Sequence, residues 1–123
     1  MGLRLGLLSD CGPDVPQLWP QCPLAPLIDS AVFSCQEGRK KPDPLLYHTV
    51  AQRLGVSASA CVYVGDGSSD ELRGATVAGR VPILRWMPLE NVYDHDRTDV
   101  ITWDGMAVHA IEELPQVLMQ MQQ

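Results

Sequence analysis

The sequence has no long apolar run and comparatively few basic residues. No segment approaches the roughly 18 consecutive apolar residues of a membrane-spanning helix, and the apolar stretch from Leu3 to Leu8 is too short for the core of a signal peptide. Both absences predict a soluble cytoplasmic protein. The chain holds 9 basic and 15 acidic residues, which gives a formal net charge of −6. An acidic surface repels nucleic acid and anionic lipid, so neither is an expected partner.

Paired-cysteine motifs are absent as well. The four cysteines show no CxxC pair and no histidine spacing typical of a zinc site. They are Cys11, Cys22, Cys35 and Cys61. We interpret them as free thiols in a reducing compartment. Because Cys11 has no basic neighbour that would activate its thiol, we interpret it as a small packing residue.

Apolar and charged residues occur in the proportions of an ordinary globular domain. Hydrophobic residues make up 46% and charged residues 20% of the 123 positions, and this length is typical of one domain. Short apolar runs alternate with helical patterns. We expect strands over residues 3–9, 31–35, 60–64, 81–86 and 100–103. This alternation predicts an α/β fold with a parallel sheet and helices on both faces, whose ligands bind beyond the carboxyl ends of the strands.

One helix is signalled more clearly than the others. Asp43 is a favoured N-cap residue, Pro44 suits the first helical position, and Gly55 ends the pattern. The apolar stripe between these signals consists of Leu46, Val50 and Leu54. The other expected helices cover residues 14–22, residues from about 68 to 79, and a last segment that begins at Pro115.

The stretch from Val62 to Glu71 combines a strand, a turn and two acids. An apolar β-branched run leads into the turn Gly65–Gly67, which contains Asp66, and Asp70 follows four residues later. If the next helix begins directly after the turn, both carboxylates face the same small volume. Hard oxygen ligands at such a point suit a divalent ion such as magnesium.

Two further polar groups follow the ends of earlier strands. Ser9 ends the first strand and offers a hydroxyl together with the backbone N–H groups of the next turn. Lys41 precedes a rigid Pro-Asp-Pro segment that fixes the direction of its ammonium group. Together with the acids Asp66 and Asp70, they form a predicted phosphoryl site, because phosphoryl transfer depends mainly on positioning and charge neutralisation.

These motifs, in this order, resemble the C-terminal half of haloacid dehalogenase-superfamily hydrolases, in particular the phosphoglycolate phosphatase-like members. The resemblance is carried by Leu-Leu-Ser-Asp at 7–10, Lys-Pro-Asp-Pro at 41–44, and Val-Gly-Asp-Gly-Ser-Ser-Asp at 64–70. It covers the chain from Arg4 to about Leu118. It implies a Rossmann-like core and magnesium-dependent hydrolysis of a small phosphorylated metabolite through an aspartyl-phosphate.

The resemblance also implies a role for each residue of these motifs. Ser9 would be the phosphate-binding hydroxyl, with Asp10 beside it where many relatives have asparagine. Lys41 would contact the phosphate and stabilise charge as the catalytic lysine. Asp66 and Asp70 would bind the magnesium ion.

The first motif of the family, an Asp-x-Asp after an apolar strand, has no counterpart in this order. The single literal instance, Asp94-His95-Asp96, follows the metal motif in a polar stretch that we interpret as a surface connection. In the family fold the strand of the first motif is central, and here it would lie between residues 3–9 and 60–65. We therefore expect residues 1–123 to form one incomplete core domain, without this strand and without a cap.

Three explanations of this difference stay open. The gene model is truncated, or another segment closes the gap, for example by self-association, or the protein has lost hydrolase chemistry. As given, the chain should bind metal weakly at best and be inactive or weakly active. The competing functional class is a noncatalytic phosphate- or partner-binding module derived from such a hydrolase. A phosphoacceptor receiver domain requires the opposite order of acids and lysine along the chain.

Less specific interpretations of the single residues also stay open. Asp66 and Asp70 suit a turn and a helix cap. Lys41 belongs to an Arg-Lys-Lys run that is typical of a solvated surface, and Ser9 suits a plain strand end. Asp10 is an alternative nucleophile in a degenerate first motif, because it directly follows an apolar strand.

Overall fold

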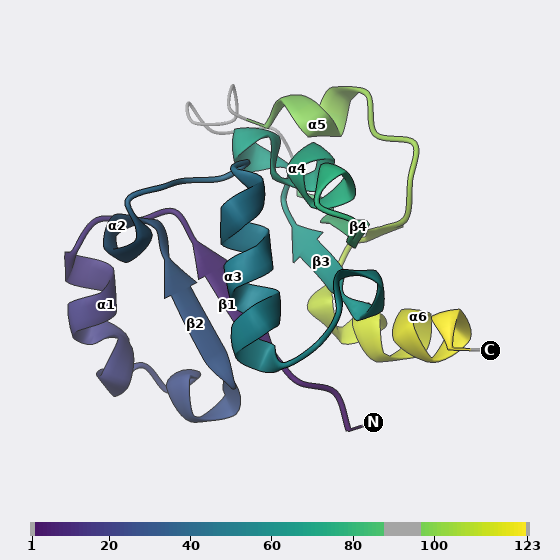
Figure 1. Ribbon diagram of the computed structural model, residues 1–123. Helices are drawn as coiled ribbons and strands as arrows, with labels where there is room; N and C mark the ends of the chain where they lie inside the picture. Colours follow the sequence, from purple (N-terminus) through teal and green to yellow (C-terminus); the bar gives the residue numbers. More distant parts are fainter. Residues whose placement is uncertain (1, 88–96, 123) are drawn as a thin grey trace.

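Strands and helices alternate along the chain, as the apolar pattern predicts (Figure 1). The computed structural model describes residues 2–87 and 97–122, so the Asp94–Asp96 stretch lies outside the described residues. The strands are β1 (Gly6–Ser9), β2 (Ser30–Phe33), β3 (Val62–Gly65), β4 (Val81–Arg85) and β5 (Ala107–Val108). The helices are α1 (Asp14–Leu18), α2 (Ser34–Glu37), α3 (Pro44–Leu54), α4 (Glu71–Val77), α5 (Thr98–Ile101) and α6 (Leu114–Met121). Within the described ranges, no helix has both the length and the apolar character needed to cross a membrane.

Helix α3 has the boundaries that its sequence signals predict. The Asp43 carboxylate accepts a hydrogen bond from the Leu45 amide at 2.9 Å, and the helix stops before Gly55. Leu46 of the predicted stripe is buried, together with its neighbour Tyr47. The N-cap and the apolar face therefore fix the start of α3, which directly follows the loop that carries Lys41 (the lysine loop).

The parallel strands form two sheets rather than one. β1 pairs with β2, while β3 pairs with β4 and β4 with β5, all in parallel. In the described part of the chain no strand joins β1 to β3, so each of them has an unpaired edge. Every residue of β1 and β3 is at least partly exposed, whereas the last two residues of β2 and the middle of β4 are buried. Among the described residues, the structure is open where the central strand of the family fold would lie.

Two helices connect the two sheets. α3 packs against β1 and β2, α4 packs against β3 and β4, and the helices contact each other (Figure 1). Tyr47, Ala75 and Ala78 form a buried cluster, against which Leu8 of β1 and Tyr63 of β3 pack. The rings of Tyr47 and Tyr63 meet edge to face, with 5.3 Å between their centroids. Side-chain packing therefore joins the halves of the described structure.

The strand predicted over residues 100–103 is wrong. Thr98–Ile101 forms helix α5, and the fifth strand lies further on, at Ala107–Val108. The helix places Asp99 so that its carboxylate accepts hydrogen bonds from two backbone amides in the first turn of α4, at 3.1 and 3.4 Å. Such tertiary contacts outweigh the weak strand preference of a short β-branched run.

We expect Gly74→Ala to destabilise the fold by about 1–3 kcal/mol. A Cβ at this position would lie 2.6 Å from Pro42 Cβ and 2.7 Å from the Tyr47 hydroxyl, so α4 would have to move away from α3 and the lysine loop. Val77→Ala, on the same helix, truncates a side chain that is 72% exposed and is the matched control. Urea unfolding followed by circular dichroism measures both variants. An unchanged midpoint for Gly74→Ala would contradict the close approach.

Candidate functional site

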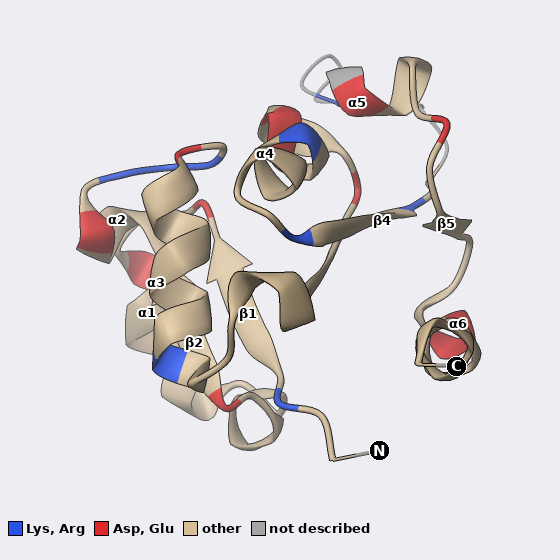
Figure 2. Cartoon of the chain, turned by 45° about the vertical axis from the view of Figure 1, so that its right-hand side comes forward, with Lys and Arg blue, Asp and Glu red and all other residues tan. Residues whose placement is uncertain are grey.

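The predicted site residues lie beyond the carboxyl ends of β1 and β3 and in the connection before α3. Ser9 ends β1, Asp66 directly follows β3, and Lys41 lies in the loop before α3. Figure 2 shows charged residues of both signs at this end of the molecule, near the starts of α3 and α4. The topology thus places the three predicted groups at one edge, as expected for parallel strands.

Lys41 is held by a buried carboxylate that was not predicted from the sequence. Its ammonium group donates to Glu71 Oε1 at 3.0 Å and to the Tyr63 hydroxyl at 3.3 Å. The Tyr63 hydroxyl donates to the same Glu71 oxygen at 2.6 Å. The side chains of Lys41 and Glu71 are only 12% and 4% exposed. Lys41 is therefore a positioned cation and not one of a solvated run.

Glu71 is itself fixed from several sides. Its Oε2 accepts a hydrogen bond from the Gly67 amide at 2.9 Å, and its backbone carbonyl accepts one from the Tyr47 hydroxyl at 2.7 Å. Its carboxylate lies against Gly65, where a Cβ would come within 2.5 Å of Glu71 Cδ. A side chain at position 65 would therefore displace the Glu71 carboxylate. The sequence signal that could have predicted this role is the position of Glu71, an acid at the start of a helix that follows a glycine turn.

Both tyrosines of this cluster keep their protons. Burial, followed by the Glu71 carboxylate, raises the pKa of the Tyr63 hydroxyl far above its usual range. The same two causes raise the pKa of Tyr47. The two hydroxyls therefore remain hydrogen-bond donors to Glu71 throughout the neutral pH range.

Asp10 links the end of β1 to the lysine loop. Its Oδ1 accepts a hydrogen bond from the backbone amide of Lys41 at 3.0 Å, so its carboxylate holds the segment that carries the cation. Ser9, directly before it, is partly exposed at the end of β1. In the turn that follows, the Cys11 amide donates to Ser34 Oγ at 3.0 Å.

Asp66 has the character of an ionised turn residue. Its Oδ1 accepts hydrogen bonds from the Ser68 amide at 3.0 Å and from the Ser68 hydroxyl at 2.7 Å. Partial burial acts to raise its pKa, but these hydrogen bonds outweigh that effect and hold the pKa of Asp66 below its usual range. Its backbone carbonyl accepts from Arg97 Nε at 2.9 Å. The turn is thus tied to the segment that begins α5.

Asp70 has a different environment from Asp66. It adopts a left-handed backbone conformation, with φ of 53°, and its carboxylate, 47% exposed, forms an ion pair with Arg73 at 3.1 Å. Asp70 is the N-cap residue of α4, yet its side chain makes no cap hydrogen bond. Asp99 caps the helix instead, through its contacts with the first turn. Asp70 therefore occupies the cap position without capping the helix through its side chain.

The described side chains supply only part of a magnesium site. Asp66 is an ionised, half-buried oxygen ligand of the kind that magnesium prefers, and one or two carboxylates with water and phosphate oxygens are its usual partners in proteins. The carboxylate of Asp70 is directed to Arg73. Residues 2–87 and 97–122 hold no group of three His, Cys, Asp or Glu side chains placed to bind a metal ion.

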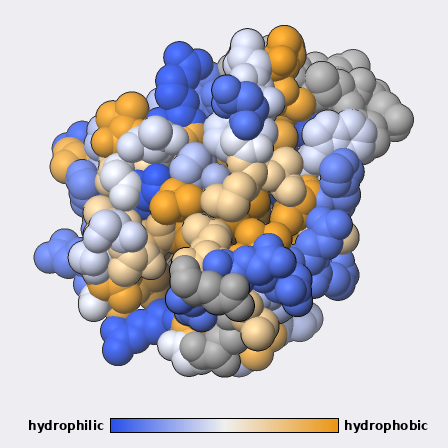
Figure 3. All heavy atoms as spheres, turned by 90° about the vertical axis from the view of Figure 1, so that its right-hand side faces the viewer, coloured by the Kyte–Doolittle hydropathy of each residue, from blue (hydrophilic) through white to orange (hydrophobic). Residues whose placement is uncertain are grey.

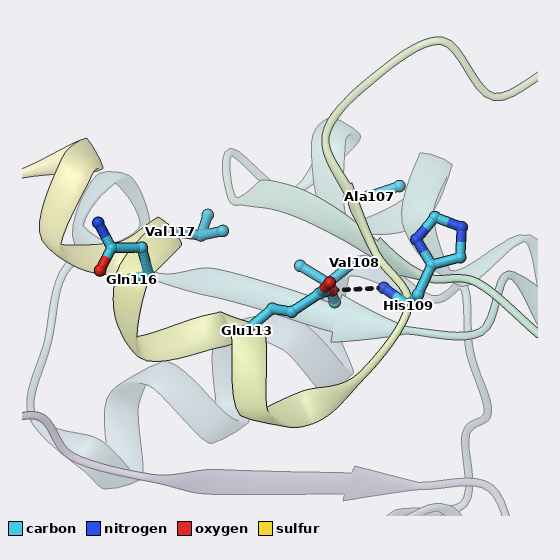
Figure 4. A pocket seen from close by; sticks show the side chains of 6 residues that line it. All are labelled: Ala107, Val108, His109, Glu113, Gln116 and Val117. Atoms are coloured by element: carbon cyan, nitrogen blue, oxygen red, sulfur yellow. Dashed lines mark hydrogen bonds between the residues drawn. The ribbon is translucent and has the colours of Figure 1, made fainter.

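A shallow cavity lies elsewhere, between β5 and α6 (Figure 4). The residues that line it are Ala107, Val108, His109, Glu113, Gln116 and Val117. Glu113 accepts hydrogen bonds from the His109 and Ala110 amides at 2.6 and 3.2 Å, and these bonds lower the pKa of its carboxyl group. The carboxylate thus stabilises the turn before α6, and this cavity contains none of the predicted site residues.

We expect Ser68→Ala to raise the pKa of Asp66, because the variant removes one of the two donors to its carboxylate. A lowered folded-state pKa contributes stability above the unfolded value of about 3.9, and this contribution disappears as the pH falls through the folded pKa. The variant should therefore be less stable than the parent at neutral pH, and the difference should vanish in acid. A carboxyl NMR titration measures the shift. Ser69→Ala, in the same turn, is the control, and an Asp66 pKa that does not respond to Ser68→Ala would contradict this assignment.

The sequence is similar to those of known hydrolases. A sequence model described as haloacid dehalogenase-like hydrolase matches residues 1–79. The chain is also similar to a glyceraldehyde 3-phosphate phosphatase of Methanopyrus kandleri, 42% identical over 52 residues, and to Phosphatase MT3486 of Mycobacterium tuberculosis, 35% identical over 80 residues. These matches cover 42% and 63% of this chain but 22% and 36% of the relatives. The chain thus spans a minor part of their length.

Solved structures share the fold over nearly the whole chain. A 2-haloacid dehalogenase from Pseudomonas syringae pv. Tomato DC3000 is 33% identical, with a TM-score of 0.71 over 96% of this chain and 47% of that one. A HAD phosphatase from Thermococcus onnurineus is 23% identical, with a TM-score of 0.76 over 95% of this chain and 51% of that one. Given the match over residues 1–79 and the Rossmann-type α/β fold, this chain belongs to the haloacid dehalogenase-like hydrolases.

Proposed function

We propose that this chain is the phosphate-binding part of a phosphomonoester hydrolase that acts on a small phosphorylated metabolite. The observation that carries the proposal is the placement of Lys41, an ammonium group held by Glu71 and Tyr63 at the edge where β1 and β3 end. Two curated relatives and one solved structure bear phosphatase names. A fixed cation beyond parallel strands suits a phosphoryl group more than an uncharged substrate.

The proposed roles follow from the contacts of each residue. Lys41 neutralises charge on the phosphoryl oxygens, and Glu71 and Tyr63 orient it. The Ser9 hydroxyl, with the turn amides behind it, donates hydrogen bonds to a phosphate oxygen. Asp10 acts through the Lys41 amide that it holds. Positioned donors and charges of this kind lower the barrier of phosphoryl transfer without reorganising during the reaction.

Asp66 is the residue that would hold magnesium in this proposal. A bound magnesium ion would neutralise charge on the phosphate and orient it. Asp70, whose Oδ1 pairs with Arg73 in the structure, would supply a second carboxylate ligand. The chain's own contribution at this point is the ionised Asp66 carboxylate, held by Ser68.

Hydrolysis through an aspartyl-phosphate also needs a nucleophile. Asp10, the alternative nucleophile, has one carboxylate oxygen engaged by the Lys41 amide, which supports a positioning role. We therefore propose that turnover requires a further strand beside β1 and β3 that brings an aspartate to this edge. By itself the chain should be inactive or weakly active.

We expect Lys41→Ala to weaken binding of inorganic phosphate by at least about tenfold, because a hydrogen bond to a charged group contributes roughly 1.5–3 kcal/mol. Lys40→Ala removes an exposed cation from the same loop and is the matched control, with little effect. Phosphate titration followed by NMR of the backbone amides measures both variants. Equal affinities would contradict the role of Lys41.

A turnover assay on the unmodified chain, with magnesium and 4-nitrophenyl phosphate, accompanies the binding test. The proposal expects a rate at, or only slightly above, that of the buffer blank. If the chain hydrolyses the ester and Asp10→Ala abolishes the rate, Asp10 is the nucleophile and the positioning role assigned to it is wrong.

A second candidate function is a noncatalytic module that binds a partner strand. The observation that favours it is that, in residues 2–87 and 97–122, one edge of β1 and one edge of β3 have no partner strand. Exposed strand edges are templates for pairing with another chain. A cavity near the start of β3 is lined mostly by apolar side chains, among them Leu3, Val62, Val81, Leu118 and Met121. Figure 3 shows an apolar area at the centre of the face toward α6.

If these edges associate, the chain should form dimers in a concentration-dependent manner. Sedimentation velocity measures the mass, and hydrogen exchange measures the backbone amides. Amides of β1 and β3 should become protected as dimers form, while those of β4, which is paired on both sides, should not change. A monomer at all concentrations, with rapid exchange in β1 and β3, would contradict association of these edges.

A further inference from the structure

Two of the four cysteines lie at equivalent positions after the neighbouring strands β1 and β2. The parallel pairing of β1 with β2 ends with Ser9 opposite Phe33, and each strand carries a cysteine two residues later, at Cys11 and Cys35. β2 ends at Phe33, before the predicted boundary, because helix α2 begins with Ser34. The strand pairing therefore ends two residues before each cysteine, and Cys35 lies in the first turn of α2.

Ser34 keeps the two segments together beyond the last strand pair. The Cys11 amide donates to Ser34 Oγ at 3.0 Å, and the Ser34 hydroxyl lies 3.4 Å from the Cys11 carbonyl oxygen. Burial raises the pKa of the Cys11 thiol, and the neighbouring Cys35 raises it further. The two side chains therefore interact. Cys35 is exposed and Cys11 partly exposed. Solvent therefore reaches both residues.

We propose that Cys11 and Cys35 form an oxidation site, whose two thiols convert to an intramolecular disulfide when the protein meets a hydroperoxide. The more exposed Cys35 sulfur, as thiolate, attacks the peroxide oxygen. The O–O bond breaks, an alcohol or water leaves, and Cys35 becomes a sulfenic acid. The Cys11 sulfur then attacks that sulfur, the S–O bond breaks, and water leaves as the S–S bond forms. The two thiols lose two electrons, and the peroxide gains them.

The bond would join the turn after β1 to the first turn of α2. Asp10, directly before Cys11, holds the Lys41 amide, so oxidation would tether the turn that positions the lysine loop. The formation of the disulfide does not depend on the proposed hydrolase function, and its test needs no substrate.

Hydrogen peroxide treatment of the folded chain, followed by mass spectrometry, tests the proposal. We expect a mass loss of about 2 Da, reversed by dithiothreitol, and a fall of the reactive thiol signal to about half. Cleavage before aspartate separates the cysteines, because Cys11, Cys22 and Cys35 then lie in the fragments 10–13, 14–28 and 29–42. The linked pair should be 10–13 with 29–42.

Matched variants distinguish this pair from the other thiols. Cys35→Ser should abolish the mass loss, while the double variant Cys22→Ser and Cys61→Ser should retain it. Circular dichroism confirms that each variant is folded, and oxidation of the urea-unfolded chain shows the pairing that occurs without the fold. A disulfide that includes Cys22 or Cys61, a link between two chains, or stepwise gain of oxygen without a link would overturn the proposal.

Discussion

The ion pair between Lys41 and Glu71 is the interaction on which the site depends. It joins the loop before α3 to the first residue of α4, and the Tyr63 hydroxyl from β3 completes it. Both charges are largely removed from water, so losing either partner would leave the other buried and uncompensated, at a cost of about 3–5 kcal/mol. Gly65, whose backbone lies against the Glu71 carboxylate, is required for the same contact. Two segments thirty residues apart in the chain therefore meet at one charged point.

Because no strand pairs with both β1 and β3 in the described part of the chain, side-chain contacts such as this ion pair must hold the two strand ends together. In a continuous sheet, backbone hydrogen bonds would hold the ends of neighbouring strands in place. Here, in the described part of the chain, β1 and β3 belong to separate sheets, and the packing of Tyr47, Ala75 and Leu8 connects them. Lys41 with Glu71 adds a polar link across the same division, and Asp10 ties the Lys41 backbone to the end of β1. The site lies where the two halves meet, which explains why its residues come from both.

Capping residues predicted helix boundaries that depend only on contacts within the same helix. Asp43 and Gly55 mark the ends of α3 because an N-cap carboxylate and a C-terminal glycine act on their own turn of the helix. The β-branched run of 100–103 predicted a strand wrongly. In the structure this segment begins as helix α5, whose Asp99 caps α4. Glu71 also escaped prediction, since its role appears only when the lysine loop folds onto it.

The sequence by itself determined the family, the α/β alternation and the order of Ser9, Lys41 and Asp66 along the chain, because motifs and apolar periodicity are properties of neighbouring residues. Only the tertiary structure decided how those residues are held. It paired Lys41 with Glu71 and brought Asp99 to the first turn of α4. The choice among several nearby acids depends on burial and on the direction of each side chain, which become fixed when distant segments pack.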